Sequence, residues 1–129
     1  MTAPPLAVVG EVNERAYDDE GGAFGPLVRV LRDDRVRTHG LRGDGAFVCV
    51  ALSLTVGDDL SIQWVATEAG HRRRGLAGRL LLRVMAEARY EGLRSATLQA
   101  SADGLSVYRR LGFRCVATLR AFLRPAAGG

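Results

Sequence analysis

The stretch Val65-Ala-Thr-Glu-Ala-Gly-His-Arg-Arg-Arg-Gly-Leu-Ala-Gly78 decides the fold. It begins in a run whose apolar residues alternate, as in a strand, and it ends where apolar residues start to recur at helical spacing. A helix start has about four backbone N–H groups without intrahelical partners, and its dipole attracts phosphate. Gly75 and Gly78 have no side chain in the way of a ligand, and Ala77 is nearly as small. The stretch therefore predicts a strand, a tight loop and a helix whose N-terminus binds an anion.

Three arginines of the loop, Arg72, Arg73 and Arg74, support this interpretation. Cations at a helix N-terminus are unfavourable against the dipole unless an anion compensates them. The loop is not a P-loop, because no lysine follows its glycine, and it lacks the Gly-x-Gly-x-x-Gly fingerprint of dinucleotide-binding folds. A solvated basic loop that leads into a packed helix fits the same residues, so this alternative stays open.

The distribution of charge favours an anionic ligand in the same region. The chain has 129 residues, a net charge of +4 and no lysine, so arginine carries all of its positive charge. Between His71 and Arg94, seven arginines stand against Glu87 and Glu91. Charge alone leaves nucleic acid, phosphate and pyrophosphate as candidates.

The hydrophobic patterns on both sides of the stretch predict an α/β sandwich with a mixed sheet. Antiparallel hairpins come first, and a helical crossover to a parallel strand follows. Helices are expected over 6–17, 24–32, 75–91 and 102–111, and strands over 36–42, 46–56, 60–67, 95–100 and 113–123. Gly92 and Gly112 lie where the third and fourth helices should end, as C-terminal cap glycines do.

The strand predicted over 46–56 is apolar on both faces. Its even-numbered residues form one apolar face, and Phe47 with the next two odd-numbered residues makes the other face apolar too. We expect this strand to be covered on both sides. Gly43-Asp44-Gly45 predicts a three-residue hairpin turn before it, and Gly57-Asp58-Asp59 the turn after it. The strand over 95–100 is expected to be short and buried.

The cysteines and histidines predict no metal site. Cys49 and Cys115 lie in separate apolar, strand-like runs, and His39 and His71 are isolated, so zinc spacing is absent. Two small buried thiols in a reducing compartment are the expectation.

Length and hydropathy predict one cytoplasmic domain over 1–129, with loose ends at 1–5 and 125–129. The apolar runs fall far short of the about 18–20 residues that a membrane span needs. The start of the chain lacks the basic n-region of a signal peptide.

A second motif, Tyr108-Arg-Arg-Leu-Gly-Phe113, places a tyrosine on the last turn of a helix that follows a strand. Leu105, Tyr108 and Leu111 share one face, so a core aromatic is one interpretation of the tyrosine. A buried tyrosine hydroxyl also requires a hydrogen-bond partner or a ligand group.

Together these motifs resemble the GNAT superfamily of acetyl-CoA-dependent N-acetyltransferases. The pyrophosphate motif of that superfamily is Arg or Gln, two variable residues, Gly, one variable residue, then Gly or Ala, and Arg72-Arg-Arg-Gly-Leu-Ala77 matches it. The superfamily also tends to end in a helix with Tyr-x-x-x-Gly-Phe, matched from Tyr108 to Phe113. Leu98-Gln-Ala-Ser101 is similar to one bacterial branch. The resemblance covers about 36–123.

The resemblance implies a three-layer sandwich with a mixed sheet of about five or six strands, and acetyl-CoA as cosubstrate without a metal. It implies that Tyr108 is a general acid that protonates the departing CoA thiolate. A backbone donor near Val65 would polarise the thioester carbonyl. The residues expected to contact the cofactor are Val65, Ala66, Thr67, Arg72, Arg73, Arg74, Gly75, Leu76, Ala77, Gly78 and Ser101.

The chain departs from the pattern of that superfamily in three ways. Ser101 stands where many relatives have Asn, seven residues before the tyrosine. No strand is predicted before the first helix, so either the chain is truncated or a partner completes the sheet. Some relatives have a Glu base on the strand where this chain has Ser61 and Gln63, and we expect Glu68 to face solvent. We therefore predict no general base.

Three functions follow in order of preference. The first is an N-acetyltransferase that acts on a primary amine of a small molecule or peptide by direct attack in a ternary complex. The second is a catalytically weak acyl-CoA-binding or regulatory module of the same fold. A nucleic-acid-binding domain is third, because the arginines lack interleaved aromatic residues. We expect no nucleic-acid or membrane partner and allow for a homodimer.

Overall fold

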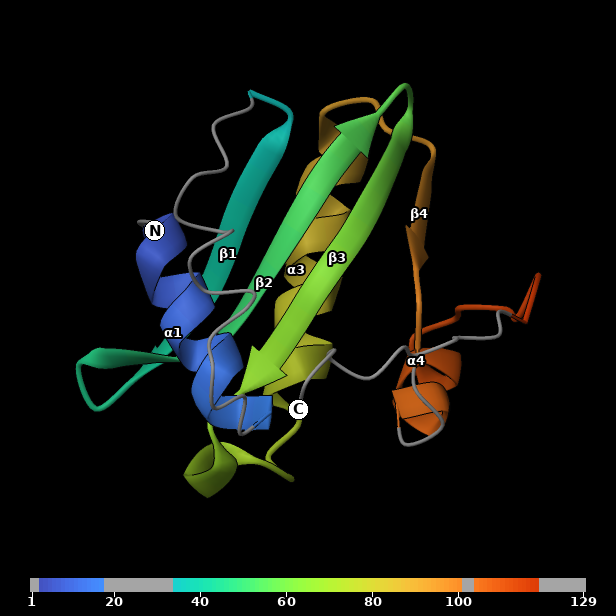
Figure 1. Ribbon diagram of the computed structural model, residues 1–129. Coiled ribbons are helices and arrows are strands. Elements are labelled where there is room, and N and C mark those ends of the chain that lie inside the picture. The colour runs from blue at the N-terminus through green and yellow to red at the C-terminus, as the bar shows by residue number, and fades with distance from the viewer. Residues whose placement is uncertain (1–2, 18–33, 101–103, 119–129) are drawn as a thin grey trace, which may run out of the picture.

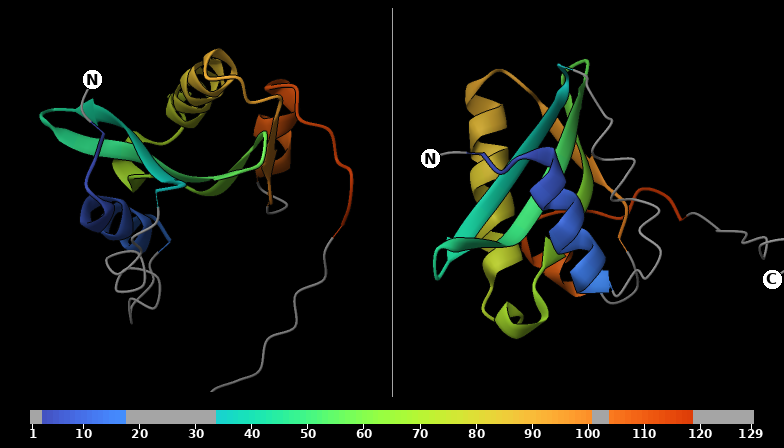
Figure 2. Two further views of the ribbon diagram at one scale, coloured as in Figure 1. Left: turned by 90° about the horizontal axis from the view of Figure 1, so that it is seen from above. Right: turned by 60° about the vertical axis from the view of Figure 1, so that its left-hand side comes forward.

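The computed structural model describes residues 3–17, 34–100 and 104–118. A four-stranded mixed sheet in the order β1-β2-β3-β4 forms its middle layer, with antiparallel β1–β2 and β2–β3 pairs and a parallel β3–β4 pair. Helix α1 covers one face of the sheet and α3 the other (Figures 1 and 2). The predicted α/β sandwich is confirmed. The elements are α1 (Leu6–Tyr17), β1 (Val36–Gly43), β2 (Ala46–Val56), β3 (Asp59–Thr67), η1 (Ala69–His71), α3 (Leu76–Tyr90), β4 (Ser95–Leu98) and α4 (Leu105–Arg110).

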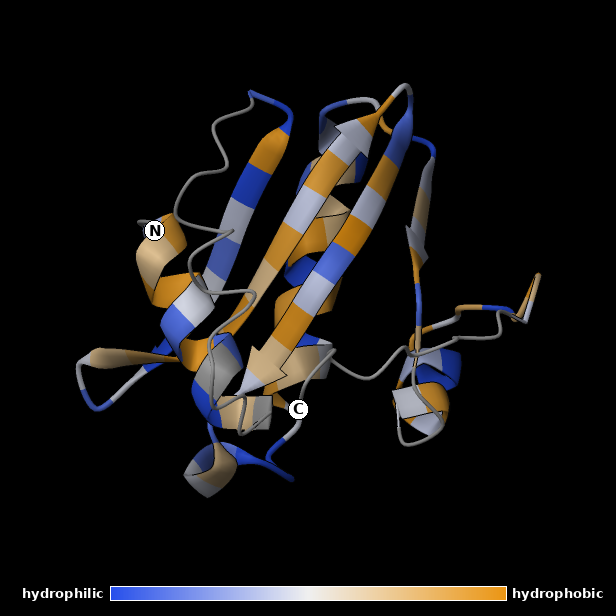
Figure 3. Ribbon diagram, in the orientation of Figure 1, coloured by the Kyte–Doolittle hydropathy of each residue, from blue (hydrophilic) through white to orange (hydrophobic). Residues whose placement is uncertain are grey.

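Strand β2 is the centre of the core because alternate residues of it enter two different hydrophobic clusters. Cys49 and Ala51 pack against α3, whereas Val50 and Leu52 pack against α1. All four side chains are at most 3% exposed. The expectation that this strand is covered on both sides is confirmed, and β2 is largely apolar in Figure 3.

A β-bulge corrects the predicted face of Phe47. Leu41 pairs with Cys49 but Arg42 pairs with Phe47, so Val48 is an extra residue in β2. Because side chains alternate between the two faces of a sheet, one extra residue moves the side chains before it to the opposite face. Phe47 therefore packs with Val50 on the α1 side rather than with Cys49.

Both hairpin turns are tighter than the sequence predicts. Asp44 and Gly45, with φ of 55° and 85°, form a two-residue turn in which both residues are left-handed, and Gly43 belongs to β1. Gly57 has φ of 60° at the first position of the second turn. Asp59 is thus the first residue of β3, paired with Val56, and not part of the turn.

Helix α3 is held on the sheet by a buried apolar stripe whose members are Leu80, Leu81, Val84 and Ala88. Gly92, with φ of 96°, ends it, and the Leu93 N–H donates to the Ala88 carbonyl at 3.0 Å. This bonding pattern is a Schellman motif, so the predicted cap glycine is confirmed.

The C-terminal part departs most from expectation. Strand β4 spans only Ser95–Leu98, and its residues are alternately exposed and half-buried because it lies at the edge of the described sheet. Residues 113–118 of the predicted last strand are not in a strand, and most of them are exposed. Cys115 is therefore exposed and its predicted burial is wrong, whereas Cys49 is buried. An apolar run becomes a strand only where a neighbouring edge pairs with it.

Other predictions fall wholly or partly on residues outside the described ranges. These are the helix over 24–32, the start of the helix over 102–111 and the end of the strand over 113–123. No helix among the described residues is long and apolar enough to span a bilayer.

Polar contacts join β1 to β2 and to the C-terminal half of α3. His39 Nε2 lies 2.8 Å from the hydroxyl of the buried Ser53, and the Arg37 guanidinium donates to the Glu91 carboxylate at 2.7 Å. Arg83 donates to the Gly40 carbonyl at 3.0 Å. Burial, with further contributions from Arg37 and Arg83 that Glu91 opposes, lowers the pKa of His39 to about 4.

This pKa predicts that acid destabilises the fold. Because the pKa of His39 is about 4 in the folded protein and 6.5 when unperturbed, the unfolded chain binds more protons between these values. The free energy of unfolding should fall by about 2 kcal/mol from pH 7 to pH 5. Urea titrations across this range measure the change. His39→Gln, which can still bond Ser53 but does not titrate, should remove most of it; an unchanged slope would contradict the assignment to His39.

Candidate functional site

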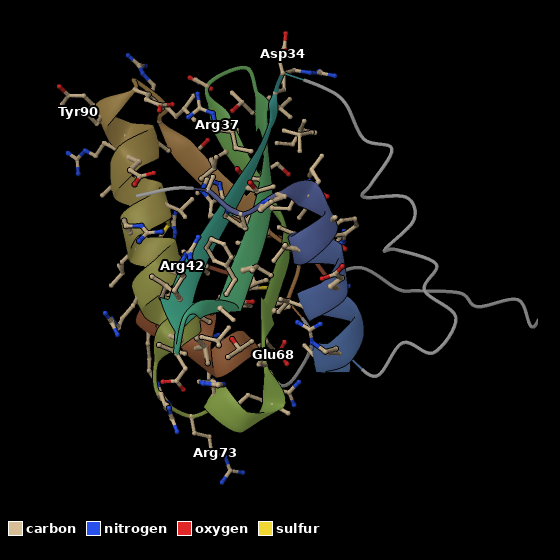
Figure 4. The ribbon with its side chains drawn as sticks, turned by 90° about the vertical axis from the view of Figure 1, so that its left-hand side faces the viewer. Asp34, Arg37, Arg42, Glu68, Arg73 and Tyr90 are labelled. Atoms are coloured by element: carbon tan, nitrogen blue, oxygen red, sulfur yellow. The ribbon has the colours of Figure 1, made fainter. Side chains whose placement is uncertain are left out.

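The loop before α3 has two left-handed residues in three positions. Arg73 has φ of 64° and Gly75, the N-cap of α3, has φ of 71°. A left-handed conformation is unfavourable for arginine but costs glycine little. Such backbone strain gathers at binding sites, where the surrounding structure maintains it. The side chain of Arg73 extends away from the body of the protein (Figure 4).

Gly75 leaves open space in front of the helix. A Cβ added there meets nothing within 4 Å. Because the N-cap residue is a glycine, the first amides of α3 receive no hydrogen bond from an N-cap side chain. The amides of the first turn, in residues 76–78, have no carbonyl partner within the helix. The end of α3 therefore presents donors to a region that a residue with a side chain would partly fill.

The first turn of α3 packs on its other sides. Leu76 and Ala77 are half-buried against the cluster that contains Leu80 and Leu81. At Gly78, an added Cβ would lie 3.7 Å from Leu111 Cδ2. Gly78 therefore brings the first turn of α3 close to the C-terminal end of α4, rather than facing open space as Gly75 does.

Arg72 has a structural contact that its predicted role did not include. Its guanidinium donates to the Thr67 carbonyl at 3.3 Å and to the carbonyl of Ala16, in the last turn of α1. The last carbonyls of a helix lack intrahelical donors, and a cation suits that end of the dipole. Arg72 thus ties the loop to β3 and to α1, although it is exposed, as Arg73 and Arg74 are.

The register of β3 decides which of its backbone groups face away from β2. The Glu68 N–H donates to the Val48 carbonyl at 2.8 Å, and Ala66 pairs with Val50. In an antiparallel ladder, hydrogen-bonded residues alternate with residues whose backbone groups point outward. Val65 and Thr67 are therefore the residues that face the β4 side, whereas Ala66 is 3% exposed and bonds toward β2.

Strands β3 and β4 part beside these groups. Their parallel pairing runs from Asp59 with Ser95 to Ile62 with Leu98, and stops there. The two strands then diverge towards the end of the protein that holds the N-terminus of α3 (Figure 1). We call this region, between 63–67 of β3 and the chain after Leu98, the β3–β4 divergence. It brings the predicted residues of β3 and of the arginine loop to one end of the sheet.

Tyr108 lies on α4, on the far side of the β3–β4 divergence from β3. Its ring is half-buried against the α3-side cluster and makes an edge-on contact with Phe113, with 6.1 Å between ring centroids. Gly112, with φ of 98°, ends α4, and the Phe113 N–H donates to the Tyr108 carbonyl at 3.1 Å. This confirms the predicted cap glycine. Ser101 lies outside the described residues.

The carboxylate closest in sequence to this site is engaged elsewhere. Glu68 binds the Arg15 guanidinium at 2.6 Å and its side chain is 23% exposed, so it is partly open to solvent but engaged in an ion pair. On β3, Gln63 donates to the Ser61 hydroxyl at 2.6 Å. Among the described residues, no cluster of His, Cys, Asp and Glu could hold a metal ion. The site offers amide donors, arginines and a tyrosine.

The contact of Arg15 with Glu68 and that of Arg72 with the Ala16 carbonyl were not predicted. The two partners in each contact lie more than 50 residues apart in the sequence, so they leave no local pattern. Asp59 was assigned to the turn because nothing in Gly57-Asp58-Asp59 distinguishes it from Asp58.

Comparisons with solved structures show the same fold. The structure superposes on the ribosomal-protein-S18-alanine N-acetyltransferase from Escherichia coli with a TM-score of 0.78 at 22% identity, covering 99% of this chain and 84% of that one. An aminoglycoside acetyltransferase from an uncultured soil metagenomic sample gives 0.76 at 13% identity, covering 94% and 87%. The aminoglycoside N-acetyltransferase AAC(6')-Iy in complex with CoA gives 0.67 at 17% identity, covering 95% and 88%.

These likenesses show a shared fold, and a search of curated protein sequences finds no match. The decisive comparison is with a family model described as an acetyltransferase (GNAT) domain, which matches residues 37–116. The matched range is more than half of the chain and includes the arginine loop, α3 and Tyr108. This chain belongs to the GNAT acetyltransferase family.

Proposed function

We propose that this chain is a cytoplasmic, single-domain N-acetyltransferase that moves the acetyl group of acetyl-CoA to a primary amine. The observation that carries the proposal is the place of Gly75. This left-handed N-cap leaves open space before α3, at the end of the sheet where β3 and β4 diverge. Membership of the GNAT family and the CoA complex of AAC(6')-Iy support the same cosubstrate.

The residues around the β3–β4 divergence suit the parts of acetyl-CoA. The amides of 72–78 would hold the pyrophosphate, with Arg73 and Arg74 adding positive charge. The outward backbone groups of Val65 and Thr67 would pair with the pantetheine arm as an added strand does. For this pairing, the Thr67 carbonyl would exchange its bond with Arg72 for one with the ligand. Ser101 would contribute a hydroxyl in place of the usual amide.

The reaction is a direct transfer within a ternary complex. The amine nitrogen attacks the thioester carbonyl carbon, a C–N bond forms and the C–S bond breaks. The Tyr108 hydroxyl gives a proton to the departing thiolate, and the amine loses one to water. A thiol has a pKa near 8.5 and a tyrosine one near 10, so this donation is feasible without being strongly driven. Holding the amine and thioester together then supplies most of the acceleration.

The acceptor is proposed as a primary amine of a small molecule or peptide. The names of the similar structures include an acetyltransferase of an alanine in a ribosomal protein and acetyltransferases of aminoglycosides. Both kinds of acceptor carry primary amines, which is the common chemistry that this proposal adopts.

One observation favours a second candidate, an acyl-CoA-binding module with little turnover. Glu68, the carboxylate at the end of β3, is occupied by Arg15, so no described carboxylate there is free to deprotonate an amine. Release of free thiol from acetyl-CoA with a panel of amines distinguishes the enzyme from the binding module.

Coenzyme A should stabilise the fold under either candidate. At about 100 times its dissociation constant, a ligand stabilises the folded state by about 2.7 kcal/mol, which raises the Tm of a domain of this size by about 5–10 °C. Differential scanning fluorimetry with and without coenzyme A measures the shift. A short single-stranded oligonucleotide should give none; a shift with the oligonucleotide alone would favour nucleic-acid binding.

Gly75→Ala should weaken coenzyme A binding. Alanine at a φ of 71° costs about 1–2 kcal/mol of stability, and its Cβ enters the space before α3. Gly70→Ala is the matched control, since its Cβ also meets nothing within 4 Å and its φ is not left-handed. We expect calorimetry to show at least a tenfold loss of affinity for Gly75→Ala and no loss for Gly70→Ala. Equal affinities would mean that the pyrophosphate binds elsewhere.

Tyr108→Phe should lower kcat about 100-fold and leave coenzyme A affinity unchanged, because it removes the proton donor but keeps the ring that contacts Phe113. Tyr90→Phe removes a hydroxyl from a side chain that is 94% exposed at the end of α3 (Figure 4), and it should change neither quantity. Steady-state kinetics and calorimetry on both variants give the result. Loss of affinity in Tyr108→Phe would indicate that this hydroxyl has a structural role.

A further inference from the structure

The closed end of the β3–β4 pair is joined by one carboxylate. Asp59, the first residue of β3, accepts a hydrogen bond from the Ser95 hydroxyl through Oδ1 and another from the Thr97 hydroxyl through Oδ2, both at 2.7 Å. A carboxylate has two oxygens, so it can accept from two donors at once. One side chain of β3 therefore binds two alternate residues of β4.

The backbone strengthens the same end. The carbonyl of Asp58 accepts the N–H of Arg94 at 2.8 Å and that of Ser95 at 3.4 Å. The ladder then continues for only four residue pairs, from Asp59 with Ser95 to Ile62 with Leu98. The hydrogen bonds between the two strands among the described residues thus concentrate at the end opposite to the β3–β4 divergence.

Strand β4 has a small interface with the rest of the described residues. It has four residues, it lies at the edge of the described sheet, and its hydrophobic side chains that pack on the core are those of Ala96 and Leu98. Short parallel pairs are weak, since independent stability needs more strands or more burial than this. The two bonds of Asp59, to the exposed residues Ser95 and Thr97, therefore add to the four ladder pairs that fix β4 beside β3.

Strand β4 and α4 are coupled through the core, because Leu98 of β4 and Tyr108 of α4 pack against the same hydrophobic cluster. They are also close in sequence, since Leu105, the first residue of α4, follows Leu98 by seven positions. A shift of β4 would change both the angle at which the strands part and the distance of Tyr108 from β3.

We infer that Asp59 is a positioning residue, which fixes the start of β4 and thereby the width of the β3–β4 divergence and the place of Tyr108. This inference rests on the proposed function, because the divergence is where acetyl-CoA would bind. The role belongs to the two-armed geometry of the side chain and not to its charge. Asparagine can keep both arms, since its amide oxygen accepts from one hydroxyl and its NH₂ donates to the other.

The test compares Asp59→Ala with Asp59→Asn. In Asp59→Ala we expect amide hydrogen exchange in β4 to become at least tenfold faster, and the coenzyme A dissociation constant by calorimetry to rise about tenfold. The kcat at saturating acetyl-CoA should fall as well, because Tyr108 moves with β4. Asp59→Asn should restore all three quantities to within about threefold. Paired Ser95→Ala and Thr97→Val substitutions should reproduce Asp59→Ala without touching the carboxylate.

Ser61→Ala is the matched control. Ser61 lies two residues further along β3, and its hydroxyl binds Gln63 of the same strand instead of β4. It should leave exchange in β4 and coenzyme A affinity unchanged. Equal losses in Asp59→Asn and Asp59→Ala would overturn the inference in favour of an electrostatic role. Faster exchange with unaltered coenzyme A affinity and kcat would overturn it in favour of a purely structural one.

Failure of the inference and failure of the proposed function are distinguishable. If the unmodified chain binds no coenzyme A, the proposed function fails. Hydrogen exchange then still decides whether Asp59 fixes β4: an unchanged rate in Asp59→Ala refutes this, and a faster rate retains the positioning of β4 alone.

Discussion

The burial of β2 on both faces is the constraint on which the rest of the structure depends. Alternate residues of this strand enter two separate clusters, so α1 must lie on one face of the sheet and α3 on the other. Once α3 is fixed behind β2 and β3, the short connection through η1 brings its N-terminus to the end of β3. The N-terminus of α3 and the outward backbone groups of Val65 and Thr67 thus come together through packing in the core.

The parts of the fold that the sequence predicted are those whose cause is local. The apolar stripe of α3, its glycine cap and the two-faced burial of β2 each follow from side chains close together in the chain. The candidate site residues in the arginine loop and at Tyr108 were likewise located from short motifs, and their roles stay predictions. Bringing them to one end of the sheet required only the order of strands and helices.

What could not be predicted depends on distant partners. The bulge at Val48 reverses Phe47 because β1 pairs with β2 in one particular register. Cys115 is in an apolar run, but the described part of that run has no strand beside it and remains exposed. Arg72 bonds Ala16, and Glu68 bonds Arg15, across more than 50 residues. A pattern of neighbouring residues contains no information on such pairs.

These two distant contacts also bear on how the chain could promote acyl transfer. Arg15 from α1 binds Glu68 after β3, and Arg72 from the loop binds the last turn of α1, so two contacts in opposite directions join α1 to the site. Each is exposed and therefore contributes little stability alone. Their effect is geometric, because they restrain the helix on one face of the sheet relative to the loop that precedes α3. Under the proposed function, a site with no free carboxylate base among its described residues would depend on such restraint, since the approach of the two reactants would then be its main contribution to rate.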